Sequence, residues 1–298
     1  MDLTRAALAA INVAFTAAFN TSFTGVAPTF QRVAMTVKST TRHQAYPKLH
    51  ELGPMREWVG ERFVERLEAD GFVITNRKFE KTLAVSVDDI ADDLIGIHGT
   101  FLADMGQTAA ELPDELVWEQ LEKGFTSEHY DGQLFFDTDH PVVGENGQES
   151  SVSNFQGGAG AAWYLVDDSR PVKPIIFQDR EPAKIVPKTN LTDENVFNHD
   201  EYVWGAKRRA AAGFGAWQLV YASRQPLTPA NYALARQAMM SMRGHRGRKL
   251  ALKPKLLVVS SANEGAAREI LLAERNAAGA TNVWQNSAEL HVETRLTL

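Results

Sequence analysis

Histidine and aspartate side chains concentrate between residues 129 and 140. Such groups can bind a metal ion or move a proton, so one alternative function is a metal-dependent hydrolase centred on His129, Asp131, Asp139 and His140, with Asp137 nearby. The spacing argues against that chemistry. No two histidines stand four apart, no glutamate lies between them, and Pro141 fixes a turn whose polar side chains are explained by local backbone hydrogen bonds. We therefore expect turn residues here and predict no catalytic, cofactor-binding or metal-binding residue.

Two further patterns resemble ligand-binding motifs but lack the neighbouring residues that such motifs require. Four aspartates, Asp88, Asp89, Asp92 and Asp93, suit a divalent cation, but the regular spacing of a calcium loop is missing. Carboxylates before a helix satisfy its free N–H groups, so we expect a helix start. The run 157–160 (Gly-Gly-Ala-Gly) lacks the Lys-Ser/Thr of a phosphate loop and is expected to be a surface loop.

A basic loop, Arg243–Lys249 with Lys253 and Lys255 nearby, is where a nucleic acid could be bound electrostatically. A DNA-binding module is therefore another alternative, although no aromatic residues interleave the basic ones and the net charge is −6. We expect a solvated hairpin or a salt contact between subunits.

The elements that position these groups follow from periodicity. Leu8, Ile11, Phe15 and Phe19 form one helical stripe in a segment with no charge from Ala6 to Phe30. Polar residues interrupt that segment, so we expect neither a signal peptide nor a membrane span. Extended runs are predicted over 58–67 and 72–87, and their many charges predict a projecting two-stranded ribbon.

The rest of the chain alternates helices and strands, which indicates an α+β protein. We predict one helix over 94–105 and another beginning at Pro113. A strand is expected over 133–136 and another over 214–221. After Thr228, with Pro229 at the first helical position, we expect a helix to Met242. A strand over 256–259, a helix over 263–275 and a closing strand over 289–292 complete the pattern.

Composition predicts a soluble, folded chain without thiol chemistry and with an uneven distribution of charge. The 298 residues are 44% hydrophobic and 23% charged, and zero cysteines exclude disulfides, thiolate metal sites and a cysteine nucleophile. Residues 51–150 hold seven basic and 23 acidic side chains, whereas residues 201–298 hold 14 basic and six acidic ones. This separation of acidic and basic segments could set the orientation between copies of a self-associating protein. A monomer with one acidic and one basic face is an equal alternative.

Six motifs, taken in order, carry a resemblance to a known family. They are Trp58–Arg62, Val85–Asp93, Tyr130–Gln133 with Phe136–Pro141, Gly213–Gln218, Leu227–Tyr232 and Lys253–Val259. Together they resemble the Mu-like phage major head subunit over nearly the whole chain. The resemblance implies the HK-ninety-seven (Johnson) capsid fold, in which an extended loop, a spine helix, a peripheral domain and an axial domain follow an N-terminal arm.

That resemblance sets the expected regions. The arm would span 1–42, the extended loop with its β ribbon 43–87, the spine helix and peripheral domain 88–227, the axial domain 228–285, and a closing strand that returns to the peripheral domain 286–298. Lys48, Lys78 and Lys81 lie in the loop region, but nothing marks any of them for a covalent crosslink, so we expect non-covalent assembly.

The implied function is that of a major capsid protein rather than an enzyme. Copies would assemble into hexamers and pentamers of an icosahedral shell around double-stranded DNA, which they would touch non-specifically. A scaffold or protease, a portal and a possible decoration protein would be partners, with no cofactor and no membrane. The protein would reside in the virion after synthesis in the bacterial host cytoplasm. A related alternative is an encapsulin-like nanocompartment shell.

Overall fold

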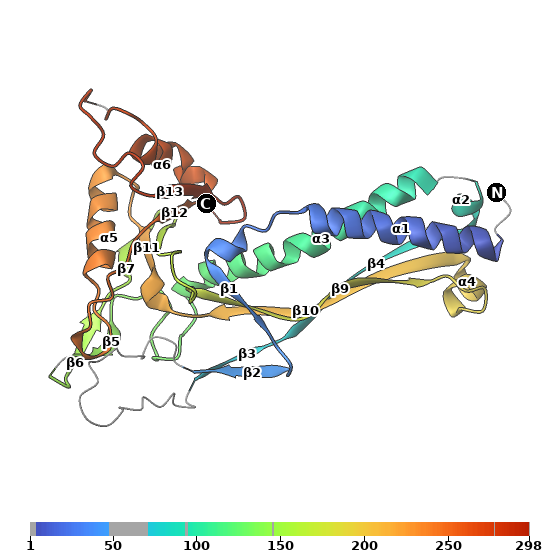
Figure 1. Cartoon of the computed structure of the whole chain (residues 1–298), viewed down its shortest axis with the longest axis horizontal. Helices are drawn as coiled ribbons and strands as arrows, with labels where there is room; N and C mark the ends of the chain where they lie inside the picture. Colours follow the sequence, from blue (N-terminus) through green and yellow to red (C-terminus); the bar gives the residue numbers. More distant parts are fainter. Residues whose placement is uncertain (1–3, 48–70, 93–94, 145, 277, 298) are drawn as a thin grey trace, which may run out of the picture.

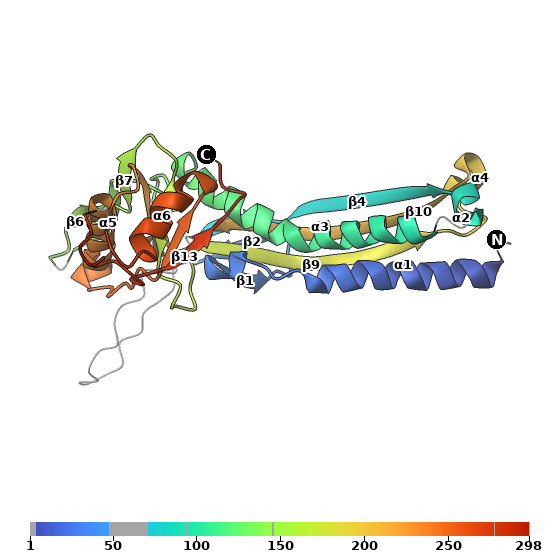
Figure 2. The same cartoon turned by 90° about the horizontal axis from the view of Figure 1, so that it is seen from above.

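The computed structural model describes residues 4–47, 71–92, 95–144, 146–276 and 278–297, and these form a body with a long extension (Figure 1). Four strands form the sheet of the extension, in the spatial order β1 (Ala34–Lys38), β9 (Ile175–Lys188), β10 (Glu201–Phe214) and β4 (Arg77–Ser86). Strand β1 is parallel to β9, and the other neighbours are antiparallel. Two helices, α1 (Arg5–Gly25) and α3 (Ile95–Glu122), lie side by side along this sheet (Figure 2). The far end carries α2 (Val87–Ala91) and α4 (Glu194–His199).

Helix α1 confirms the predicted stripe. Thr4 caps it by accepting a hydrogen bond from the Ala7 N–H at 3.2 Å. Ile11, Phe15 and Phe19 are buried in a core shared with α3 and β10. By length and composition α1 would also suit a membrane span, but here its apolar stripe packs inside the protein.

The two long helices approach closely at one glycine. A Cβ added at Gly106 of α3 would lie 2.2 Å from the Phe19 carbonyl oxygen of α1, which no real side chain tolerates. Asn12 of α1 is also fixed: it accepts a hydrogen bond from the Trp204 indole at 3.0 Å and donates one to Thr189 at 3.0 Å. Close packing therefore joins α1 to α3, and the polar contacts of Asn12 join α1 to the sheet beneath it.

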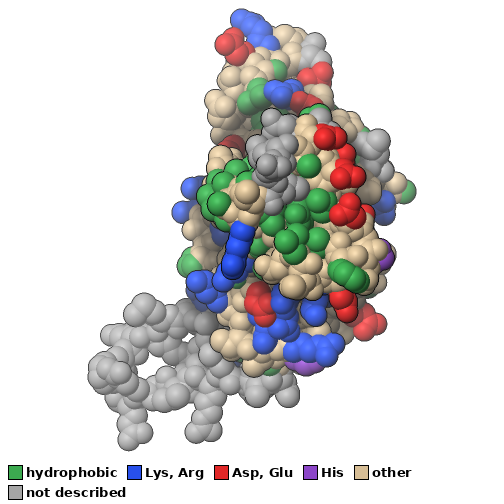
Figure 3. Space-filling model, turned by 90° about the vertical axis from the view of Figure 1, so that its right-hand side faces the viewer, with side chains coloured by type: hydrophobic (Ala, Val, Ile, Leu, Met, Phe, Trp, Pro, Cys, Tyr) green, Lys and Arg blue, Asp and Glu red, His purple; other side chains and the backbone are tan. Residues whose placement is uncertain are grey.

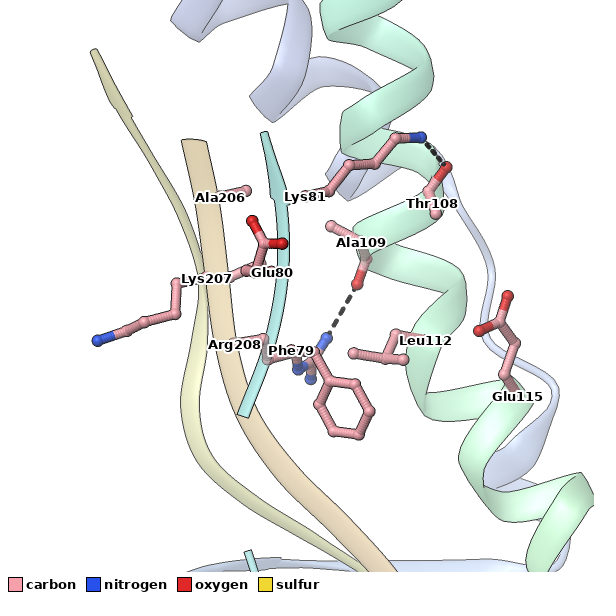
Figure 4. A pocket seen from close by; sticks show the side chains of 11 residues that line it. Phe79, Glu80, Lys81, Thr108, Ala109, Leu112, Glu115, Ala206, Lys207 and Arg208 are labelled. Carbon is pink, nitrogen blue, oxygen red and sulfur yellow. Dashed lines mark hydrogen bonds between the residues drawn. The ribbon is translucent and has the colours of Figure 1, made fainter. Parts of the chain in front are cut away.

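The predicted break of the spine helix at Pro113 is wrong, because α3 continues from Ile95 through Pro113 to Glu122. Proline has no N–H to donate to the carbonyl four residues earlier, that of Ala109. Arg208 of β10 supplies the missing donor, with its Nη1 3.2 Å from the Ala109 oxygen (Figure 4). The β9–β10 pairing shifts register on both sides of Arg209, next to this arginine. A distant side chain thus compensates for the proline.

The body is built on a five-stranded sheet. Its spatial order is β13 (Glu289–Val292), β12 (Leu256–Val259), β8 (Trp163–Val166), β11 (Val220–Arg224) and β7 (Phe155–Gly158), with α5 (Pro229–Ser241) and α6 (Glu264–Leu271) packed on it. Every residue of β8 and β12 is buried, and Trp118, Phe135 and Trp217 pack into the same core. Two small antiparallel pairs complete the fold: β2 (His43–Tyr46) with β3 (Phe72–Thr75), and β5 (His140–Val143) with β6 (Glu149–Val152).

Several local predictions are confirmed. Thr228 caps α5 by accepting from the Asn231 N–H at 3.2 Å, and Pro229 is its first residue. Strands β12 and β13 lie where the hydrophobic runs place them. Helix α6 ends at Leu271, four residues before the predicted Arg275. The run over 58–67 lies outside the described residues.

Three predicted elements are wrong. Residues 133–136 form only an isolated bridge, Glu128 with Leu134, rather than a strand. The strand over 214–221 is divided, because β10 ends at Phe214 and β11 begins at Val220, with a 3-10 turn, η3 (Trp217–Leu219), between them. The expected glycine loop contributes Gly157 and Gly158 to β7, where positive φ angles of 81° and 100° require glycine.

The pairing of two strands shows how segments from different expected regions come together. Strand β13 pairs with β12, so it lies at one edge of the five-stranded sheet. Strand β4, expected inside the projecting ribbon of 43–87, pairs with β10 from Arg77 to Ser86. The five-stranded sheet contains strands from before residue 227, between 228 and 285, and after 285.

Candidate assembly surfaces and the buried His140 network

The structure brings together two of the four residues considered for an enzyme. His140 begins β5 and is fully buried, with its Nδ1 2.7 Å from Asp131 Oδ2 and its Nε2 3.1 Å from Asn154 Oδ1. The ring stacks on Trp217 at a centroid distance of 3.9 Å and an interplanar angle of 9°. Both ring nitrogens therefore face oxygen acceptors, and one face of the ring is covered by the indole.

Asn154 fixes the geometry of this network. Its Nδ2 donates to the backbone oxygens of Phe135 and Trp217, while its Oδ1 also accepts from the Asp137 N–H. Burial acts to raise the pKa of Asp131, but the hydrogen bond and charge of His140 outweigh it and hold that pKa below its usual value. The arrangement ties together three loops and presents no open histidine nitrogen for a substrate.

The other candidates in this segment lie elsewhere. His129 packs among Tyr130, Phe135 and Phe214, with the Tyr130 ring 4.0 Å away. Asp139 is exposed. Asp137 accepts hydrogen bonds from the N–H groups of Leu134 and Thr138 as a turn residue. Among the described residues, no group of three or more metal-ligating side chains converges.

The aspartate cluster at 88–93 shapes a short helix. Ser86 caps α2 by accepting from the Asp88 N–H, Asp88 and Asp89 lie in its first turn, and Asp92 ends it. Asp93 lies outside the described residues. The predicted role at a helix start is thus confirmed for the first two aspartates.

A junction that the sequence did not indicate joins the N-terminal segment to α3 and β13. Asp114 Oδ1 accepts from the N–H groups of Thr29 at 2.9 Å and Phe30 at 2.7 Å. The Thr29 hydroxyl lies 3.1 Å from Asp114 and 3.2 Å from Glu293, and it accepts from the Trp118 indole at 3.1 Å. Asp114, Trp118 and Glu293 lie 85, 89 and 264 positions from Thr29, so no local pattern reveals the junction.

Glu293 is the charged centre on the strand side of this junction. Its burial favours the neutral acid, but hydrogen bonds from His291 and Arg295 outweigh that effect and lower the pKa of Glu293 to about 2. Nearby, Arg32 pairs with Asp168 and Glu289 at 2.6 and 2.7 Å. The N-terminal segment is thereby fastened to the body.

The extension exposes large apolar side chains. Phe197 of α4 is 84% exposed and Leu191, just before α4, is 72% exposed, so the described residues leave both largely uncovered. The others on the extension are Val13, Ile97, Phe101 and Val186. Figure 3 shows hydrophobic side chains gathered on this end, with acidic side chains alongside. Phe197 stands in the mostly polar stretch 192–201, and this was the sequence signal for the surface. The sequence analysis did not predict it.

The basic residues singled out in the sequence, Lys81 and those of the loop 243–249, make contacts within the subunit. Lys81 of β4 pairs with Asp104 of α3 at 3.1 Å, so it is engaged within its own chain. The basic loop after α5 forms a small hairpin closed by the bridge between Arg243 and Lys249. It includes the 3-10 turn η4 (His245–Gly247), which lies against β5.

Sequence comparison places the chain among phage head proteins. The family model for the Mu-like prophage major head subunit gpT matches residues 8–296. The major capsid protein of Escherichia phage Mu is 39% identical over 289 residues, which cover 95% of each chain. The Mu-like prophage FluMu major head subunit of Haemophilus influenzae is 36% identical over 255 residues, or 83% of each chain.

Structural comparison agrees. The chain superposes on one from the procapsid of bacteriophage JBD30 with a TM-score of 0.89, 37% identity, and coverage of 99% of this chain and 100% of that chain. A chain from the JBD30 capsid gives a TM-score of 0.78 with 27% identity and full coverage of both. The fold is therefore the HK-ninety-seven type that the sequence motifs imply, and the chain belongs to the Mu-like prophage major head subunit family.

Proposed function

We propose that this protein is the major capsid subunit of a Mu-like tailed phage or prophage, assembling into hexamers and pentamers of an icosahedral shell around double-stranded DNA. The observation that carries the proposal is the match to the Mu major capsid protein over 95% of both chains. The shape of the chain agrees with it, because a long extension with exposed apolar side chains gains most when neighbouring copies cover it.

The regions of the proposed capsid subunit follow its two sheets. Residues 1–42 serve as the arm, the extended loop begins at residue 43, and α3 is the spine helix. The four-stranded sheet belongs to the peripheral region. The axial region is the five-stranded sheet with α5 and α6, and it includes β8 and β11 because these strands pair directly with each other and with β12.

Further partners follow from the same proposal. A scaffold or protease and a portal act during assembly, and packaged DNA is touched non-specifically through phosphates. A JBD30 capsid is decorated with minor capsid protein trimers, and we propose that a decoration protein binds this shell as well. The mature location is the virion, after synthesis in the bacterial host cytoplasm.

We also propose that the His140 network is structural, so the protein works without catalysis. A buried network whose members are hydrogen-bonded to one another holds loops in one arrangement, and leaving one member without its partner is costly. His140→Ala is accordingly expected to impair folding of the subunit. Turnover of a phosphoester or peptide substrate by the wild type that is lost in this variant would contradict the proposal.

The primary test is expression of the full chain alone, followed by light scattering and negative-stain electron microscopy. Shells, tubes or rings of five and six copies are the expected result. A stable, monodisperse monomer or dimer at high concentration would count against self-assembly. The nucleic acid content of shells purified from induced host cells separates a DNA-filled head from an encapsulin-like compartment, which would instead contain a cargo protein.

A further inference from the structure

We propose that one face of the extension sheet is the surface on which a second copy of this chain docks through its helix α4. The inference rests on the proposed function, since it needs copies of the chain to meet in an assembly. Helices α1 and α3 pack on the other face, where Tyr202 and Trp204 are buried beneath them (Figure 1). Neighbouring residues of a strand point to opposite faces, so Thr82, Gly205 and Val186 lie side by side on the free face, which we call the outer face.

Gly205 makes a hollow in the outer face that the subunit itself does not require. It lies inside β10, between Thr82 of β4 and Val186 of β9. A Cβ added at Gly205 would make only an ordinary contact, 3.5 Å from Thr82 Oγ1, and the φ angle of this glycine is not positive. Glycine inside a strand destabilises it relative to alanine, and it often marks a place where another chain approaches closely. The hollow is therefore suited to a contact from outside the subunit.

The outer face carries cations that its own carboxylates leave unpaired. Lys184 of β9 and Lys207 of β10 lie directly opposite each other, and like charges in that position destabilise a sheet. Glu181 pairs with Lys207 at 3.5 Å and with Arg209 at 2.9 Å, so these two cations are engaged. Lys184 and Lys188 are exposed and make no ion pair with any of the described residues. Both ammonium groups are therefore free to pair with carboxylates from another chain.

Helix α4 of a second copy has the opposite properties. Phe197 and Leu191 are exposed apolar side chains at the far end of the extension. Glu194, at the start of α4, and Asp200, which ends it, are exposed carboxylates without an ion pair among the described residues. Each copy thus presents an apolar group beside free carboxylates in one place, and a hollow beside free ammonium groups in another. Contact between two copies brings these complementary surfaces together.

The spacings of the two surfaces agree. On α4, Glu194 and Phe197 are three residues apart, which places their Cβ atoms about 5–6 Å from each other. On the sheet, Lys184 is the diagonal neighbour of Gly205, at a distance of about 7–8 Å for such positions. The long lysine side chain spans the difference. With the ring of Phe197 on Gly205 of its neighbour, Glu194 reaches Lys184.

Packaged DNA fits the outer face less well. Its phosphates would pair with Lys184 and Lys188, but they offer no apolar partner to Val186, which is 63% exposed between these lysines on β9. Glu80 lies on the same face, opposite Lys207, and repels a phosphate. The outer face therefore favours an acidic protein segment with an apolar side chain, which α4 supplies.

The first test fills the hollow. Gly205→Val replaces glycine by a residue that favours strands, so the subunit should unfold at the same or higher denaturant concentration. The protein concentration needed for shells should nevertheless rise about tenfold, because the Phe197 ring of a neighbour no longer reaches the sheet. Thr36→Val is the control, since it places the same side chain at an exposed position of β1 beside Phe177, away from the outer face. It should assemble as wild type does.

The second test exchanges the charges of the expected pair. Lys184→Glu and Glu194→Lys should each raise the concentration needed for shells about tenfold, because either change places like charges in contact. The chain that carries both substitutions should assemble within about threefold of wild type, since the pair is restored with reversed sign. Two impaired single variants without recovery in the double variant would overturn the pairing of Glu194 with Lys184.

The third test identifies the occupant, and it uses the absence of cysteine from the sequence. Copies with Asn198→Cys, next to Phe197, are assembled together with copies that carry Thr82→Cys, and the shells are treated with a short bismaleimide. We expect dimers that join one copy of each kind, detected by peptide mass spectrometry. Ala17→Cys in place of Thr82→Cys is the control, because Ala17 is exposed on α1, which packs on the other face of the sheet. No cross-link between residues 198 and 82, or normal shells of Lys184→Glu that hold less DNA, would overturn the inference.

The outcomes separate this inference from the proposed function. Normal shell formation by both Gly205→Val and Lys184→Glu overturns the inference alone. Absence of shells from the wild type and from Thr36→Val overturns the proposed function and the inference together.

Discussion

The body and the extension bury their apolar residues in different ways. In the body, strands β8 and β12 are buried at every residue, with other elements packed on both faces of the sheet. In the extension, two helices lie along one long sheet, and strand β9 passes from four buried residues to a stretch of half-buried and exposed ones. The body therefore buries most of its apolar side chains inside the subunit. The extension leaves several of its apolar side chains exposed, where neighbouring copies can cover them.

The largest expected effect tests whether these regions unfold separately. Phe135 in the body and Phe19 in α1 are both fully buried, and truncation of either to alanine should cost about 3–5 kcal/mol. Phe135→Ala should lower the denaturant midpoint of the whole subunit. Phe19→Ala should mainly accelerate amide hydrogen exchange in α1, with the body protected as before.

Hydrogen exchange measured by mass spectrometry on both variants decides the matter. Equal loss of protection in α1 and in β8 for both variants would show that the body and the extension are one cooperative unit.

The next effect concerns the contact that carries α3 through Pro113. Arg208→Met removes the donor to the Ala109 carbonyl and the pair with Asp179, which should cost about 1–3 kcal/mol. In a Pro113→Ala background the helix supplies its own N–H to Ala109, so the same substitution should cost less. Urea unfolding of the four proteins in this cycle measures the difference.

A matched control for that cycle is available next to Arg208. Lys207→Met removes a more exposed cation and should change stability by less than about 0.5 kcal/mol in either background. If the costs of the substitutions at Arg208 and Pro113 simply add, the two residues do not interact, and Arg208 does not compensate for the proline.

The junction between arm and body should make stability depend on pH. The pKa of Glu293 is about 2 in the folded protein, below its ordinary value of 4.5. Its stabilising contribution is therefore complete above the unfolded pKa and is lost as the pH falls from about 4.5 towards 2. Glu293→Gln should flatten the fall in stability over that interval.

Thermal unfolding at a series of pH values checks this expectation, with the exposed Glu269→Gln as the control. Identical pH profiles for wild type and Glu293→Gln would show that other carboxylates dominate acid unfolding.

The sequence predicted the elements that local signals determine. Thr228 followed by Pro229 predicts α5, and the stripe ending at Phe19 predicts α1, because caps and periodicity act within a few residues. The motifs also identified the family and its fold. The continuity of α3 was not predictable, since Arg208 lies 99 residues from Ala109, and neither was the Thr29 junction, whose partners meet only after folding.

The same distinction explains what was missed about sites. His140 and Asp131 are near in sequence, so the sequence analysis could consider them together. Only the structure shows that Trp217 stacks on the His140 ring and that Asn154 is hydrogen-bonded to it, which makes the network a structural one.

The smallest expected effect on the subunit tests what the extension leaves uncovered. Phe197→Ser removes an exposed ring, so subunit stability should change by less than about 0.5 kcal/mol. If neighbouring copies cover that ring in the shell, its loss should raise the protein concentration required for assembly by about tenfold, which corresponds to about 1.4 kcal/mol of lost burial. Asn198→Ser, on the next exposed residue of α4, controls for the change to serine and should assemble as wild type does. Sedimentation of assembled and free subunits measures the assembly of both variants. Normal assembly by Phe197→Ser would mean that the end of the extension stays exposed to solvent in the shell. Neighbouring copies would then have to cover the extension through its other exposed apolar residues, among them Val13, Ile97 and Phe101.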